Sequence, residues 1–136
     1  MGKSKSGGSF DTNMRLRLVL GDVPSQTHAV EGILAAGVAF DVSNAALIEM
    51  VYVLEKILRK DRMLIQENVS AITRDKRFLT SKKLFAECMP LYVEHPSLSM
   101  VDCVLLTEAR LRKAIPLYTF DQKLVQHSNE DAIVPR

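Results

Sequence analysis

The chain has 136 residues, 47% of them hydrophobic and 25% charged, with a formal net charge of +2 at pH 7. This composition predicts one globular domain with its own core, and two cysteines without a CxxC pair argue against a secreted disulfide framework. We expect a cytoplasmic protein without a membrane partner, because no apolar run approaches the roughly 18 residues of a membrane span.

The first elements follow a Gly/Ser/Lys-rich start. We expect residues 1–9 to form a disordered or tag-like tail, so that the single domain spans residues 10–136. Phe10 is then the end of a short first strand. Two helices are predicted next, over 13–20 and over 24–37, and Gly37 ends the second of them.

Strands and helices alternate through the rest of the chain. Strands are predicted over 38–42, 116–120 and 132–134, and helices over 44–59, 62–73, 81–94, 99–113 and 122–127. Such alternation predicts a three-layer α/β/α sandwich around a central parallel sheet. In this fold class, ligands bind beyond the carboxyl ends of the strands.

One acid stands out in the helix predicted over 44–59. This helix is apolar almost all round, which is typical of a buried helix. Glu49 lies too far from Ser43 to cap it, and no Lys or Arg stands three or four residues away. Burying an unpaired carboxylate costs on the order of several kcal/mol. We therefore expect Glu49 to be protonated, to pair with a distant group such as an arginine, or to bind a metal.

Three other acids occupy the ends of predicted strands or the starts of predicted helices. Asp11 follows the first strand, Asp121 ends the strand over 116–120, and Asp102 interrupts an apolar run. Each alone is more simply a helix cap, and Ser99-x-x-Asp102 is similar to a capping box. Because carboxyl ends of parallel strands share one edge, we nevertheless expect these acids and Glu49 to converge on one rim of the sheet.

Converging carboxylates indicate a particular chemistry. Several negative charges in a small volume need a counter-charge, and hard oxygen ligands select Mg²⁺ or Mn²⁺. Such ions suit phosphodiester hydrolysis, because they polarise the phosphate and lower the pKa of an attacking water. The histidines fall in no zinc-binding spacing, and no G-x-S-x-G motif is present.

Basic residues gather in four places, over 59–62, 74–77, 82–83 and 110–113. These groups could hold an RNA backbone. A solvated helix surface explains each group alone equally well.

Four segments, in this order, resemble the PIN-domain nucleases, most closely the toxins of VapBC-type toxin–antitoxin pairs. They are Asp11-Thr12-Asn13 and the segments 47–54, 99–103 and 119–124. The resemblance implies a parallel sheet of four or five strands and a Mg²⁺ or Mn²⁺ site in which Asp11, Glu49, Asp102 and Asp121 are the catalytic and metal-binding acids. The supporting residues would be Asn13, Ser99 and Thr119.

The resemblance also implies an activity and partners. The implied protein is an endoribonuclease toxin that forms a homodimer and is silenced by a protein antitoxin. The chain departs from the family in its first strand, where Gly7-Gly8-Ser9 replaces the usual apolar run.

Two alternatives remain open. The first is a non-catalytic PIN-fold binding or scaffold module in which the acids only cap helices. The second is a phosphoryl-transfer domain with Asp11 as nucleophile, which the absence of a second aspartate in Asp11-Thr12-Asn13 disfavours.

Overall fold

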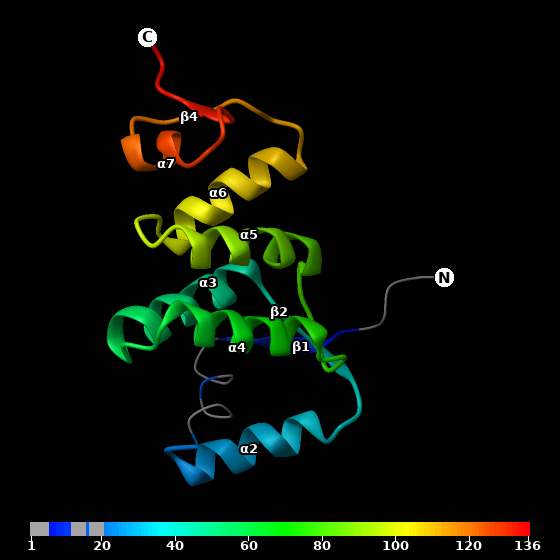
Figure 1. Ribbon diagram of the computed structural model, residues 1–136. Coiled ribbons are helices and arrows are strands. Elements are labelled where there is room, and N and C mark those ends of the chain that lie inside the picture. The colour runs from blue at the N-terminus through cyan, green and yellow to red at the C-terminus, as the bar shows by residue number, and fades with distance from the viewer. Residues whose placement is uncertain (1–5, 12–15, 17–20) are drawn as a thin grey trace.

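The computed structural model describes residues 6–11, 16 and 21–136. Within these ranges the fold is mixed α/β (Figure 1), as the sequence predicts. The α-helices are α2 (Pro24–Leu34), α3 (Asn44–Tyr52), α4 (Arg62–Arg74), α5 (Lys82–Glu94), α6 (Met100–Leu111) and α7 (Gln122–Gln126), and the π-helix η1 (Val53–Ile57) continues α3. The strands are β1 (Ser6–Phe10), β2 (Ala39–Val42), β3 (Phe78–Leu79), β4 (Leu117–Tyr118) and β5 (Ala132–Ile133).

The predicted helices from residue 24 onward are confirmed, although their ends shift by a few residues. The helix predicted over 13–20 falls almost entirely outside the described residues. Strand β3 and the π-helix were not predicted. No helix in the described ranges is long and apolar enough to cross a membrane.

The strands form two separate parallel sheets. One has the order β1-β2-β3, with Phe10 level with Val42 and Phe40 level with Phe78. The other pairs β4 with β5, with Leu117 level with Ala132. The prediction of one central sheet of four or five strands is therefore wrong for the described part of the chain.

The reason lies in the helices between the two sheets. Helix α5 packs against α4 and α6, and α6 also packs against α3. Figure 1 shows α3, α5 and α6 between the β1-β2-β3 sheet and the β4-β5 sheet. Because α6 leads the chain away from β1, strand β4 pairs with β5 instead.

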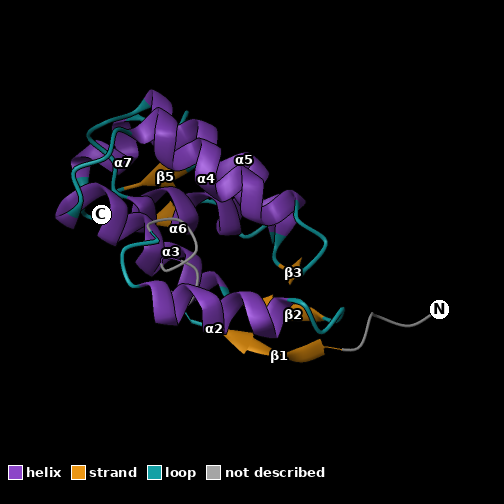
Figure 2. Ribbon diagram, turned by 90° about the horizontal axis from the view of Figure 1, so that it is seen from below, coloured by secondary structure: helices purple, strands orange, loops and turns teal. Residues whose placement is uncertain are grey.

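Three aromatic side chains join the strands of the larger sheet. The ring of Phe10 lies 5.0 Å from that of Phe40 and 5.6 Å from that of Phe78, measured between centroids. All three rings are buried. Figure 2 shows that α2 lies over this sheet. One hydrophobic core thus continues from these strands into the helices.

Strand β1 begins at Ser6, so residues 6–9, which the sequence predicts to lie in the tail, form part of the three-stranded sheet. Gly8 has φ 137°, a conformation that favours glycine, and Gly7 is explained by close packing. A Cβ atom on Gly7 would lie 2.5 Å from Val38 Cγ2 and 2.9 Å from Phe40 Cε1. The side chains of the β2 segment therefore occupy the space that apolar residues of β1 would fill.

The segment β4-α7-β5 is held to the helices by polar and aromatic contacts. Arg110 on α6 donates from Nε to Asp131 Oδ2 at 2.7 Å and from Nη2 to the Ser128 carbonyl at 2.7 Å. The rings of His95 and His127 stack with centroids 4.5 Å apart.

Candidate functional site

Asp11 lies where the sequence places it, directly after β1, and it is exposed. Because Phe10 is level with Val42, the register puts Asp11 level with Ser43, the N-cap residue of α3. Asp11 therefore lies at the carboxyl end of the three-stranded sheet. Asn13, its expected supporting residue, is outside the described residues.

Glu49 is exposed, so the expectation that it is buried is wrong. Helix α3 buries only one side, through Leu47, Met50 and Val51. The apolar residues on the other side reach solvent too, and Tyr52 is 55% exposed. Composition alone therefore overstated the burial of this helix. Within the described ranges, Glu49 makes no hydrogen bond or ion pair.

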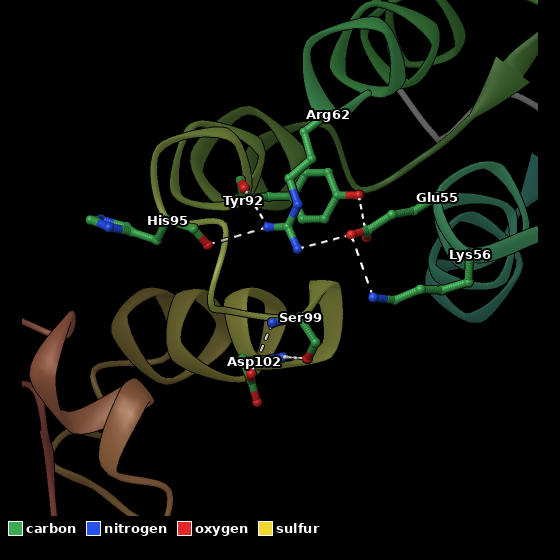
Figure 3. Close-up of polar contacts among 7 residues, drawn as sticks. All are labelled: Glu55, Lys56, Arg62, Tyr92, His95, Ser99 and Asp102. Carbon is green, nitrogen blue, oxygen red and sulfur yellow. Dashed lines mark hydrogen bonds and ion pairs between the residues drawn. The ribbon is translucent and has the colours of Figure 1, made fainter. Parts of the chain in front are cut away.

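Asp102 takes part in a complete capping box at the start of α6 (Figure 3). The Ser99 backbone N–H donates to Asp102 Oδ2 at 2.9 Å, and the Asp102 N–H donates to Ser99 Oγ at 3.1 Å. The structural interpretation of this pair is thus confirmed. In Figure 3 the second carboxylate oxygen points away from Ser99.

Asp121 caps α7. Its Oδ1 accepts hydrogen bonds from the N–H groups of Lys123 at 2.9 Å and Leu124 at 3.2 Å. Thr119 supports this turn, because its Oγ1 accepts from the Asp121 N–H at 3.0 Å. Both residues belong to the β4-α7-β5 segment.

The four acids do not gather into one cluster. In the part of the chain that the structure describes, no three His, Cys, Asp or Glu side chains form a group that could hold a metal ion. Asp121 is separated from the expected common rim, because it follows β4, which belongs to the second sheet. Helix α3 links the other three acids: it starts beside Asp11, carries Glu49 and packs against α6, which carries Asp102.

A polar cluster that the sequence did not reveal lies beside the capping box (Figure 3). Glu55 on η1 accepts from the Tyr92 hydroxyl at 2.6 Å and from Arg62 Nη2 at 3.1 Å. Arg62 also donates from Nη1 to the carbonyls of Tyr92, at 2.6 Å, and His95, at 3.2 Å. Its guanidinium carbon lies 4.0 Å from the centroid of the Tyr92 ring.

This cluster sets the ionisation of its members. Burial by itself raises the pKa of Glu55, but the Tyr92 hydrogen bond and the Arg62 charge outweigh it, so the pKa lies below its ordinary value. Burial and the carboxylate of Glu55 raise the pKa of Tyr92. The cluster is therefore an ionised carboxylate held by a neutral phenol and a cation, with no reactive group left over.

The sequence contains a pattern that predicts an ion pair for Glu55, but it predicts the wrong partner. Glu55 stands four residues before Arg59, which is the spacing of an exposed helical ion pair. The structure prevents that pairing because the helix winds into a π-turn and Arg59 has φ 56°, outside the helix. The cationic partners of Glu55 are Arg62, at the start of the next helix, and the neighbouring Lys56.

The two cysteines are buried free thiols, as predicted. Burial raises the pKa of Cys88 and of Cys103 to about 12. Neither thiol forms a thiolate nucleophile near neutral pH.

Comparisons of the chain with models of known protein families, with curated proteins and with solved structures gave no match. The resemblance to PIN-domain nucleases thus rests on the four short segments alone.

Proposed function

We propose that the chain is a metal-dependent endoribonuclease that cleaves RNA phosphodiesters with an activated water. The observation that carries the proposal is the packing of α3 on α6, because these helices bear Glu49 and Asp102. Asp11 lies at the strand end beside the start of α3. The assignment to a PIN-like domain belongs to this proposal.

The available carboxylates fit a hard cation that takes only a few ligands from the protein. Mg²⁺ is usually held by one or two carboxylates, with water and substrate phosphates completing its shell. Glu49 is exposed and has no partner in the described ranges, and one oxygen of Asp102 points away from the capping box. Glu49 and Asp102 would hold the ion, and Asp11 would lie beside the start of the helix that carries Glu49. A bound Mg²⁺ or Mn²⁺ supplies phosphate polarisation and water activation.

The chain's own residues then fix the geometry. Ser99 holds Asp102 through the capping box, and this fixes one carboxylate oxygen. Thr119 Oγ1 accepts a hydrogen bond from the Asp121 backbone N–H and so supports the turn at the start of α7, and Asp121 would act outside the metal-binding pair. The proposed physiological role is the toxin of a toxin–antitoxin pair. Its partners would be a protein antitoxin and a second copy of the chain.

The substitution Asp102→Asn tests this function. Asparagine keeps the oxygen that accepts the Ser99 N–H, so the capping box and the fold should persist. Because a catalytic metal contributes several kcal/mol, we expect RNA cleavage to fall by about a hundredfold or more. Cleavage is measured on labelled RNA pools with Mn²⁺, and circular dichroism checks the fold.

Mn²⁺ calorimetry adds a readout without catalysis. Glu49→Gln should weaken Mn²⁺ binding, whereas Glu67→Gln, on the exposed side of α4, should leave it unchanged. Undiminished cleavage by folded Asp102→Asn protein would contradict the proposal.

A second candidate is a non-catalytic binding or scaffold module. It is favoured by the hydrogen bonds of Asp102 and Asp121, since both carboxylates cap helices. Exposed apolar residues on α6, Val101 at 51% and Leu105 at 46%, would suit a protein contact. A folded wild-type chain that binds no Mn²⁺ would support this candidate.

A further inference from the structure

Two neighbouring pockets form one groove beside the carboxyl ends of β2 and β3. The first, of about 710 Å³, is lined mainly by residues 41–44 and 79–82. The second, of about 370 Å³, is lined by the first turn of α5 and by the end of α6. The pockets share Asn44, Ser81 and Lys82. We call this combined surface the α5 groove.

The groove brings together two basic groups that lie far apart in the sequence. Lys82 and Lys83 stand in the first turn of α5, and Arg112 is the C-cap residue of α6. They meet because α5 and α6 pack side by side in opposite directions (Figure 1). The acidic side chains of the groove are Asp41 and Glu108, so the charge of the lining is positive.

The walls of the groove also offer hydrogen-bonding groups. Two helices, α3 and α5, begin there. Ser43 caps α3, but Ser81 makes no side-chain capping hydrogen bond to α5. The first-turn N–H groups of α5 therefore lack the usual side-chain acceptor.

Thr80 adds a second, independent feature. It lines the first pocket, and its Oγ1 is shielded from solvent without a hydrogen-bond partner among the described residues. A buried hydroxyl without a partner is unfavourable. Thr80 Oγ1 is thus a polar group at the wall of the first pocket whose hydrogen-bonding capacity is not satisfied within the described residues.

We propose that the α5 groove binds the phosphodiester backbone of single-stranded RNA. Lys82, Lys83 and Arg112 contact phosphates, while the first-turn N–H groups of α5 donate hydrogen bonds to phosphate oxygens. The identity of the ligand rests on the proposed nuclease function. The groove adjoins that site at Asp11, which lies level with Ser43, a residue of the first pocket.

The test measures RNA affinity without cleavage. Fluorescence anisotropy of labelled oligouridylate, in EDTA, compares the wild-type chain with Lys82→Glu/Arg112→Glu. Lys60→Glu/Lys76→Glu is the matched control, because both lysines are exposed, lie outside the groove and change the net charge by the same amount. All four positions are exposed, so the variants should fold.

We expect the double variant to bind at least about tenfold more weakly and the control to bind as the wild type does. Each lost phosphate contact should also flatten the slope of log K against log salt by about 0.7. Equal affinity of wild type and double variant, or no RNA binding by the wild type, would overturn the groove. Inorganic phosphate is the competitor: displacement of the RNA by millimolar phosphate would reassign the groove to small phosphates.

The nuclease role of Asp102 and RNA binding by the α5 groove can be disproved independently. Asp102→Asn should retain RNA affinity in EDTA, because Asp102 lies outside the groove. If the double variant loses RNA binding while Asp102→Asn still cleaves, the groove stands and the assignment of Asp102 falls. If Asp102→Asn loses cleavage while the double variant binds RNA normally, the assignment of Asp102 stands and the groove proposal falls.

Discussion

At the scale of single residues, the Tyr92 hydroxyl shows how a buried polar group is satisfied. Tyr92 is 0% exposed, so its O–H must find a partner inside the protein. Glu55 provides it, and Arg62 balances the charge that Glu55 brings. Because Glu55 and Arg62 are only 19% and 15% exposed, water competes weakly for these contacts.

Tyr92→Phe should lower the free energy of unfolding by about 1.5–3 kcal/mol, since it removes a hydrogen bond to a charged group. Tyr52→Phe is the control, because Tyr52 is 55% exposed. Urea unfolding monitored by circular dichroism measures both. Equal stability of the Tyr92→Phe variant and the wild type would show that the hydroxyl contributes nothing.

The same cluster predicts a pH dependence. The pKa of Glu55 is lower in the folded protein than its ordinary value of 4.5, so the ionised carboxylate stabilises the fold. This contribution is present above pH 4.5 and is lost as the pH falls through the lowered pKa. Unfolding curves measured downward from pH 6 should show a smaller loss of stability in Glu55→Gln than in the wild type.

The acids show how far sequence reasoning reaches at this scale. The capping roles of Asp102 and Asp121 could be predicted, because a cap depends on local spacing. The partner of Glu55 could not, because Tyr92 lies 37 positions away and only the packed helices bring it near. The principle that a buried acid needs a distant partner was sound, but it applied to Glu55 instead of Glu49.

At the scale of elements, the helix starts divide into capped and uncapped ones. Ser43 accepts a hydrogen bond from the Ala46 N–H at 3.1 Å, and Asp61 accepts one from the Leu64 N–H at 2.8 Å. Ser81 has the same place before α5 but makes no such bond. The side chains of Ser43 and Ser81 are identical and occupy matched positions, but they should contribute differently to the stability of the fold.

Ser43→Ala should cost about 1 kcal/mol of stability, the usual value of a side-chain cap. Ser81→Ala should cost only a few tenths, since there is no capping bond to lose. Chemical denaturation of the two variants measures the difference. Equal losses would mean that the Ser81 side chain caps α5 in solution.

Element positions were predictable where a helix has a long apolar pattern and a cap. Strand β3 has two residues, too few to show an alternating pattern. The π-helix η1 could not be predicted either, because the same five residues can form an α-helical or a π-helical turn.

At the scale of the whole molecule, the division into two sheets could not be read from the sequence. Strands β4 and β5 have two residues each, and such short strands carry little information about which neighbour they pair with. Packing of α6 on α3 and α5 decides the outcome. The mixed α/β class was predictable, because it depends only on the order of elements.

The close packing of β1 on the β2 segment requires a residue without a side chain at Gly7. Gly7→Ala should destabilise the protein by about 1–3 kcal/mol, because its Cβ would lie 2.5 Å from Val38 Cγ2. Gly32→Ala is the opposite case: nothing lies within 4 Å of its Cβ, and alanine should stabilise α2 by about 0.5–1 kcal/mol. Thermal unfolding of both variants compares the signs. Stabilisation by Gly7→Ala would show that β1 does not pack this closely on β2.

The burial of the two thiols has a practical consequence for observing this molecule. Cys88 and Cys103 lie on α5 and α6, the helices that pack at the centre of the fold, and each is 0% exposed. A thiol reagent can reach them only when these helices separate. The rate of chemical labelling in the absence of denaturant therefore reports how often the centre of the protein opens, through residues that the chain already carries.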